Sequence, residues 1–97
     1  MPIDPRGAKA TATALDKYHG SKVFEKAAFT IGLDELISRR LLWESAQASL
    51  VDSWKLTIDE LGLLLPEVER RLRLLAPPEE ASAAFARLRS FVLNWEE

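Results

Sequence analysis

Few residues of this chain combine the type and the spacing that catalysis requires. His19 is the only histidine, and no nucleophile motif accompanies it. The acid pairs Asp59–Glu60 and Glu79–Glu80 lie where helices are expected to begin. Adjacent residues of a helix point in different directions, so neither pair converges on one substrate atom. We therefore expect a non-enzymatic protein without a catalytic residue.

The sequence has equally few residues that could form a metal or cofactor site. The chain contains no cysteine, which excludes disulfides, thiolate metal sites and iron–sulfur clusters. One imidazole with scattered carboxylates has no spacing that supports a zinc site. The segment "YHGSKVF" has one glycine and lacks the pattern of a phosphate-binding loop. We expect neither a metal nor a cofactor.

The most informative residues are polar side chains on the apolar side of a predicted helix over residues 33–55. Arg40 and Glu44 are four residues apart, so they can pair. Tryptophan and arginine in a row are typical of interface hot spots. The sequence thus predicts a partner-binding stripe made of Arg40, Trp43, Glu44, Gln47, Leu50 and Trp54. The alternative is a helix near the surface, with the Arg40–Glu44 pair covering the edge of the core.

A second candidate lies in "LTIDELGLLLPEVERRLRLLAPPEE", residues 56–80. Thr57 and Glu60 match a capping box, and Pro66 suits the first position of a further helix, so two helices are expected to meet at Pro66. About twenty residues of this stretch look like a helix-turn-helix. The likeness fails at the apolar turn and at the first recognition positions, where Glu67 and Glu69 would face a polyanion.

The arginines of this stretch have a simpler interpretation as a solvated face. Glu67–Arg71 and Glu69–Arg73 are acid-first pairs four residues apart. Nucleic-acid binding remains an alternative function. It would use Arg70, Arg71 and Arg73, helped by Lys17, Lys22 and Lys26.

The helices that must position these residues can be placed by periodicity and caps. Residues 13–29 form one helix, two helices with Ser21 capping the second, or, over residues 22–31, a strand. In the 33–55 helix, the apolar side carries Leu33, Leu36, Ile37, Trp43, Leu50, Val51 and Trp54, and the opposite side carries Ser38, Ser45, Ser49 and Asp52. The last helix begins at the prolines 77–78 and has the best apolar stripe, which is Ala81, Ala84, Phe85, Leu88, Phe91, Val92 and Trp95. Three leucines point off these stripes and favour a second buried surface: Leu42, Leu74 and Leu93.

Length and composition support one small helical domain. The chain has 97 residues with a formal net charge of −2, and leucine and alanine, its main apolar residues, favour helix. We expect an all-α, compact bundle of four to five helices over residues 11–97, after a flexible N-terminal arm over residues 1–10. No apolar run approaches the ~20 residues of a membrane helix, and the N-terminus lacks the apolar region of a signal peptide, so a cytoplasmic protein without membrane association is expected.

The function that these observations favour is a small helical protein-interaction module: an adaptor, regulatory subunit or inhibitor. It would bind a protein partner or its own copy through the aromatic and arginine-bearing helix face. The alternative is a nucleic-acid-binding transcriptional regulator that uses a helix-turn-helix-like hairpin at residues 57–75. A third hypothesis is a small chaperone or assembly factor.

Overall fold

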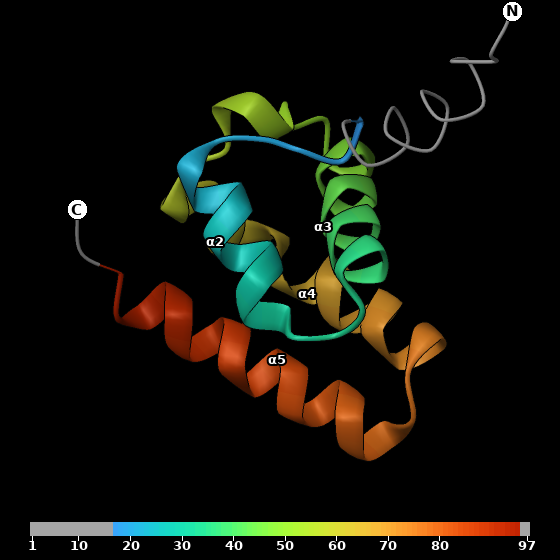
Figure 1. Cartoon of the computed structure of the whole chain (residues 1–97). Helices are drawn as coiled ribbons and strands as arrows, with labels where there is room; N and C mark the ends of the chain where they lie inside the picture. Colours follow the sequence, from blue (N-terminus) through green and yellow to red (C-terminus); the bar gives the residue numbers. More distant parts are fainter. Residues whose placement is uncertain (1–16, 96–97) are drawn as a thin grey trace, which may run out of the picture.

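Helices form most of the chain from Lys22 onward. The computed structural model describes residues 17–95 and contains α2 (Lys22–Ile31), α3 (Glu35–Ala48), the short 3-10 helix η1 (Ser53–Lys55), α4 (Ile58–Leu75) and α5 (Pro78–Leu93) (Figure 1). No strand occurs among these described residues. The all-α prediction is confirmed, and the strand considered for residues 22–31 is wrong. The predicted arm over residues 1–10 and the start of the predicted domain over residues 11–97 lie outside the described part.

The helices begin where the sequence predicted helix starts. Ser21 caps α2, its hydroxyl accepting from the Phe24 N–H, as predicted. The Thr57–Glu60 capping box of α4 is complete: the Thr57 hydroxyl accepts from the Glu60 N–H at 3.2 Å, and the Glu60 carboxylate accepts from the Thr57 N–H at 3.1 Å. α5 starts at Pro78 with Glu79 and Glu80 in its first turn. These local signals act through a residue and the three that follow it, so sequence suffices to find them.

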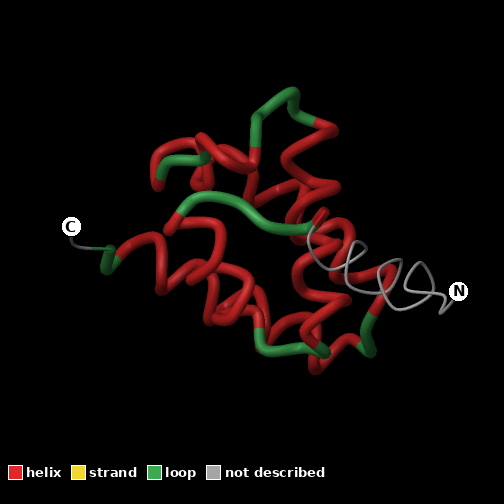
Figure 2. The backbone as a smooth tube through the Cα atoms, turned by 45° about the horizontal axis from the view of Figure 1, so that its top comes forward, coloured by secondary structure: helices red, strands yellow, loops and turns green. Residues whose placement is uncertain are grey.

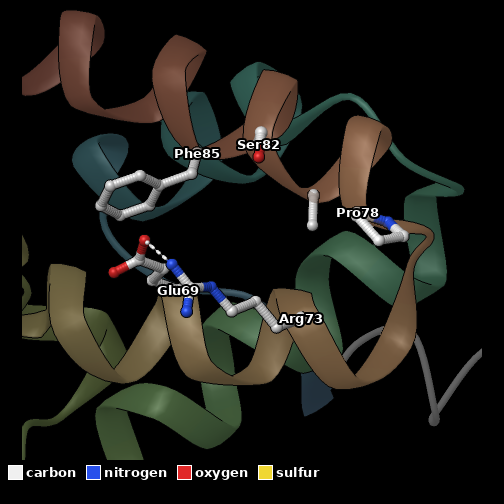
Figure 3. A pocket seen from close by; sticks show the side chains of 6 residues that line it. Glu69, Arg73, Pro78, Ser82 and Phe85 are labelled. Atoms are coloured by element: carbon white, nitrogen blue, oxygen red, sulfur yellow. Dashed lines mark hydrogen bonds and ion pairs between the residues drawn. The ribbon is translucent and has the colours of Figure 1, made fainter.

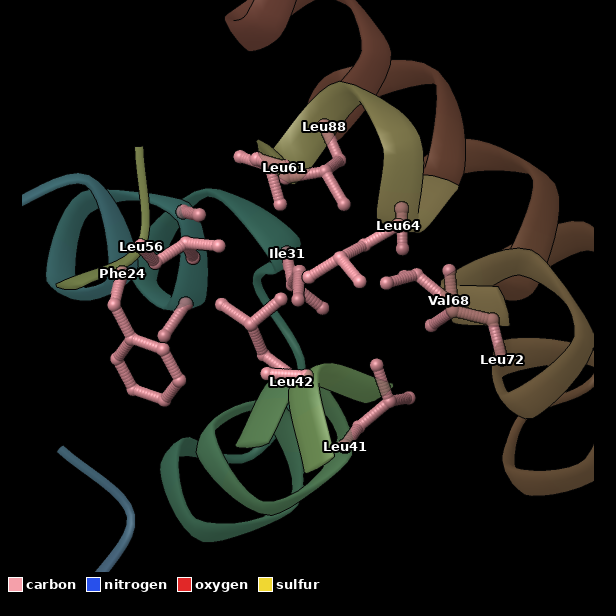
Figure 4. Packing of buried hydrophobic residues seen from close by; sticks show 14 of the residues in the cluster. Phe24, Ile31, Leu41, Leu42, Leu56, Leu61, Leu64, Val68, Leu72 and Leu88 are labelled. Atoms are coloured by element: carbon pink, nitrogen blue, oxygen red, sulfur yellow. The ribbon is translucent and has the colours of Figure 1, made fainter. Parts of the chain in front are cut away.

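The four α-helices pack in a ring, in which α2 contacts α3 and α5, and α4 contacts the same two (Figures 1 and 2). Figure 4 shows how side chains from all four helices fill the centre. The fully buried large residues are Phe24, Ile31, Leu41, Leu42, Leu61, Leu64, Val68, Leu72 and Leu88. None of the described helices is both long and apolar enough to span a membrane.

The buried face of α3 differs from the prediction. The helix ends at Ala48 instead of running to residue 55, and it buries Ser38, Leu41, Leu42, Ser45 and Ala46. Leu36 and Ile37, expected inside, are exposed. The serines tolerate burial because each hydroxyl has a local partner: the Ser45 hydroxyl donates to the Leu41 carbonyl at 2.9 Å, and the Ser38 hydroxyl accepts from the Leu33 N–H at 3.1 Å.

The predicted break at Pro66 is also wrong. Pro66 lies inside α4, which continues without interruption from Ile58 to Leu75. A proline within a helix removes one backbone hydrogen bond and disturbs the preceding turn. A single buried stripe (Leu61, Leu64, Val68 and Leu72) extends on both sides of Pro66, and its burial outweighs that local cost. The helix-turn-helix-like hairpin at residues 57–75 therefore does not exist in this fold.

Of the three leucines predicted to point off their apolar stripes, only two are exposed. Leu42 is fully buried, because the side of α3 that contains it faces the core. Leu74 and Leu93 are exposed. The predicted stripe of α5 does face inward, with Ala81, Ala84 and Leu88 buried and its aromatic members partly buried against them.

Two glycines yield opposite stability predictions. A Cβ added at Gly62, inside α4, would meet only Val92 Cγ1 at 3.8 Å. We expect Gly62→Ala to raise the free energy of unfolding by about 0.5–1 kcal/mol, because alanine favours helix. A Cβ at Gly20 would collide with the Ser53 carbonyl oxygen and lie 2.7 Å from Phe24 Cγ. We expect Gly20→Ala to lower stability by about 1–3 kcal/mol. Urea unfolding of both variants measures the difference; equal effects would contradict the packing described here.

Candidate protein-interaction surface

The structure exposes four of the six residues predicted to bind a partner. Arg40 and Gln47 are exposed on α3, Leu50 follows the end of that helix, and Trp54 lies in η1. We call these four residues the corner surface. Trp43 and Glu44, the other two predicted residues, are half-buried.

Trp43 is held by the segment that precedes α2. The Tyr18 ring meets it edge-on at 5.4 Å between centroids, and the Lys17 ammonium lies 4.9 Å from the Trp43 ring centre. Aromatic and cation–π contacts of this kind stabilise the packing of the segment on α3. Trp43 is therefore partly covered by the segment before α2 and is less available for a contact than the four exposed residues.

The predicted Arg40–Glu44 pair is present and extends to α4. Arg40 Nε donates to the Glu44 carboxylate at 3.0 Å, and the hydrogen bond to Glu44 raises the pKa of Arg40. The other oxygen of Glu44 lies 3.6 Å from Arg71 Nη1 on α4. Glu44 thus links two helices and leaves the Arg40 guanidinium at the surface.

Leu50 has the least favourable backbone conformation of the corner surface. Its φ of 60° is left-handed, and it is the only non-glycine residue in the described chain with a positive φ. The Leu50 N–H donates to the Gln47 carbonyl at 3.0 Å and the Val51 N–H donates to the Ala46 carbonyl at 2.8 Å, which is the Schellman arrangement that usually places glycine here. The side chain is nonetheless 94% exposed. The folded chain alone gains no packing from this leucine.

Trp54 stands on a well-anchored turn. The Asp52 carboxylate accepts from the Trp54 N–H at 2.9 Å. Next to it, the buried Ser53 donates from its hydroxyl to the His19 carbonyl at 2.7 Å, and its own carbonyl accepts from the Ser21 N–H at 2.9 Å. The Trp54 side chain is 64% exposed. A rigid turn therefore holds a large aromatic ring in solvent.

A polar cluster fixes the segment that carries Tyr18. The Glu25 carboxylate binds Arg39 at 2.7 Å and His19 Nδ1 at 3.0 Å, and it accepts from the Gly20 N–H at 3.1 Å. Partial burial raises the pKa of Glu25, but hydrogen bonds from Arg39 and Gly20, with the nearby positive charges, outweigh burial and leave the pKa below its ordinary value. The hydrogen bond to Glu25 in turn raises the pKa of Arg39. His19 thus belongs to a polar cluster that connects the segment before α2 to α2 and α3.

The arginines of the nucleic-acid alternative are all paired with glutamates. Glu67 binds both Arg70 and Arg71, the latter at 3.0 Å, and the hydrogen bond from Arg70 lowers the pKa of Glu67. Glu69 binds Arg73 at 2.9 Å. Figure 3 shows this last pair beside a hollow of about 360 Å³ between α4 and α5. The helper lysines lie elsewhere: Lys22 and Lys26 belong to α2, and Lys17 covers Trp43.

Within residues 17–95, no group of three or more His, Asp or Glu side chains could hold a metal ion. No family model, curated protein or solved structure matches this chain. A function for this chain is therefore inferred from its geometry. Sequence reasoning assigned no role to Phe29, whose side chain is 87% exposed on α2.

We expect Leu50→Gly to stabilise the protein by about 1 kcal/mol, because glycine adopts a positive φ without a Cβ penalty. The matched control is Leu63→Gly, the same change at an exposed position inside α4. That variant should lose about 1 kcal/mol through helix propensity. Thermal unfolding followed by circular dichroism shows whether each variant is more or less stable than the wild type. A lower melting temperature for Leu50→Gly would show that the leucine stabilises the turn.

The Glu25 cluster predicts sensitivity to acid. A folded-state pKa below the unfolded value means that Glu25 stabilises the fold above the ordinary glutamate range, and that this stability is lost as the pH falls through that range and the lowered pKa. Between neutral pH and about pH 3 we expect a steeper fall in melting temperature for the wild type than for Glu25→Gln. Glu80→Gln removes an exposed carboxylate on α5. The melting temperature of this variant should fall with pH as steeply as that of the wild type. Parallel curves for all three proteins would contradict this role of Glu25.

Proposed function

We propose that this protein is a non-enzymatic helical interaction module that binds a protein partner through the corner surface. The observation that carries the proposal is Leu50, a fully exposed leucine in a backbone conformation that favours glycine. Unfavourable backbone conformations concentrate at functional sites, where the side chain has a use outside the folded chain itself. A partner that buries Leu50 would supply that use.

The exposed side chains of the corner surface indicate what the partner must offer. Leu50 is 94% exposed and Trp54 is 64% exposed. Both side chains can therefore enter apolar pockets that a partner provides. Buried aromatic anchors of this kind contribute most of the energy in typical interfaces.

Charge adds a second requirement. Lys55 follows Trp54 in η1 and Lys17 lies over the Trp43 ring. Neither lysine forms an ion pair with another residue in the 17–95 range. A partner with acidic groups around its apolar pocket would complement these lysines and associate faster. Adaptor, regulatory subunit and inhibitor are all compatible with such a contact. Of the alternatives, nucleic-acid binding has less support because its arginines are neutralised by Glu67 and Glu69. No observation on the described chain favours a chaperone.

The test is quantitative affinity capture from native extract with the tagged full chain and two variants, Leu50→Gly and Trp54→Ala. Both positions are exposed, so both variants should fold, and Leu50→Gly should be more stable than the wild type. We expect at least one protein to be retained by the wild type and to be lost about tenfold or more with each variant.

Leu63→Ala is the matched control, because it removes an exposed leucine from α4, away from the corner surface. It should retain the same proteins as the wild type. If all four chains capture the same proteins in equal amounts, or if the control loses them as well, the corner surface is not the binding site.

A further inference from the structure

Phe29 marks a second surface, separate from the corner surface. It projects from α2 with 87% of its side chain exposed, and it borders two hollows. One, of about 510 Å³, lies on the side of α3 and is also lined by Leu33 and Arg39. The other, of about 750 Å³, lies between α2 and α5. An exposed phenylalanine beside two hollows of this size points to a binding site.

The hollow between α2 and α5 has mainly apolar walls. Its lining residues are Phe29, Thr30, Gly32, Ala86, Arg87, Ser90, Phe91 and Asn94. We call this hollow the α2–α5 groove. At one side of it, Phe91 packs edge-on against Trp95 at 5.3 Å between centroids. Aromatic side chains on both walls can clasp an apolar side chain of a ligand.

The described side chains that carry charge around the α2–α5 groove are positive. The Arg87 guanidinium donates to the Thr30 carbonyl at 3.2 Å and to the Ile31 carbonyl at 2.6 Å. These hydrogen bonds cap the C-terminal end of α2, and the guanidinium keeps its positive charge. The Lys26 ammonium lies 5.6 Å from the Trp95 ring centre. Lys22 is exposed one turn earlier on α2. Among residues 17–95, none of the three forms an ion pair.

This differs from α4, where Arg70, Arg71 and Arg73 all have a glutamate partner. Of the described cations without an ion pair among residues 17–95, Lys22, Lys26 and Arg87 thus lie on the two helices that border an apolar groove, on a chain whose net charge is −2. Opposite charge is the complement that such a rim selects.

We infer that the α2–α5 groove binds an acidic segment of a partner protein, with an apolar side chain of the segment held between Phe29 and Phe91 and its carboxylates near Lys22, Lys26 and Arg87. A nucleic acid fits less well, because three cations on a net-negative chain compensate few phosphates. The apolar walls also favour a ligand that carries apolar as well as acidic side chains. This site is independent of the corner surface, since its residues belong to α2 and α5.

The experiment is selection of a random peptide library on the immobilised full chain, followed by affinity measurement for the selected peptides. We expect the peptides to be enriched in Asp and Glu around an aromatic or large aliphatic residue, and their affinity to fall with added salt. Phe29→Ala should weaken binding about tenfold or more. Lys26→Glu should weaken it about threefold to tenfold and reduce the salt dependence.

Two controls match these variants in chemistry but lie on α4. Leu63→Ala removes an exposed apolar side chain and Arg70→Glu reverses an exposed charge, and both should bind the peptides as the wild type does. Backbone amide shifts in nuclear magnetic resonance should move at Ala86, Ser90 and Asn94. The inference is overturned if no acidic peptide is selected, or if Phe29→Ala and Lys26→Glu bind as the wild type does. It is also overturned if single-stranded DNA or anionic vesicles are the ligands whose binding requires Phe29 and Lys26.

Discussion

The arrangement of the helices depends on the point where the chain just before α2 meets the turn that contains η1. Three hydrogen bonds join them: the Ser21 N–H to the Ser53 carbonyl, the Ser21 hydroxyl to the Leu56 carbonyl and the Ser53 hydroxyl to the His19 carbonyl. Gly20 is needed because no side chain fits between the two segments. The contact sets the start of α2, holds Tyr18 against Trp43 and fixes the base of Trp54. Both proposed surfaces rely on it: the corner surface through η1, and the α2–α5 groove through the position of α2.

The outer face of α4 is nearly neutral. Its buried stripe packs against α3 and α5, while each of its outward arginines is compensated by a glutamate one turn earlier. Short-range pairs of this kind add little stability but cancel the local field. The uncompensated positive charges therefore remain on α2, on α5 and around η1.

Much of the fold followed from local signals, whereas the exposed faces did not. The helix starts at Ser21, Thr57 and Pro78 were predictable because each involves only neighbouring residues. The face of α3 was predicted inverted, since both sides of this helix carry apolar residues and periodicity alone does not choose between them. The Arg40–Glu44 pair was predicted correctly, because the two residues are one helical turn apart. The left-handed conformation of Leu50 and the exposure of Phe29 have no sequence signal. The first depends on where α3 ends, and the second depends on which face α2 presents to the core.

The sequence by itself determined the helical class, three helix starts and the acid–base pairs along α4, since these depend on residues within one turn of each other. Only the tertiary structure decided that Ser38 and Ser45 are buried, that α4 continues through Pro66 and that Phe29 faces solvent. The physical reason is that burial is shared among helices distant in sequence. A buried stripe shared with α3 and α5 can outweigh a lost backbone hydrogen bond, and serines whose hydroxyls have local partners can be enclosed at little cost.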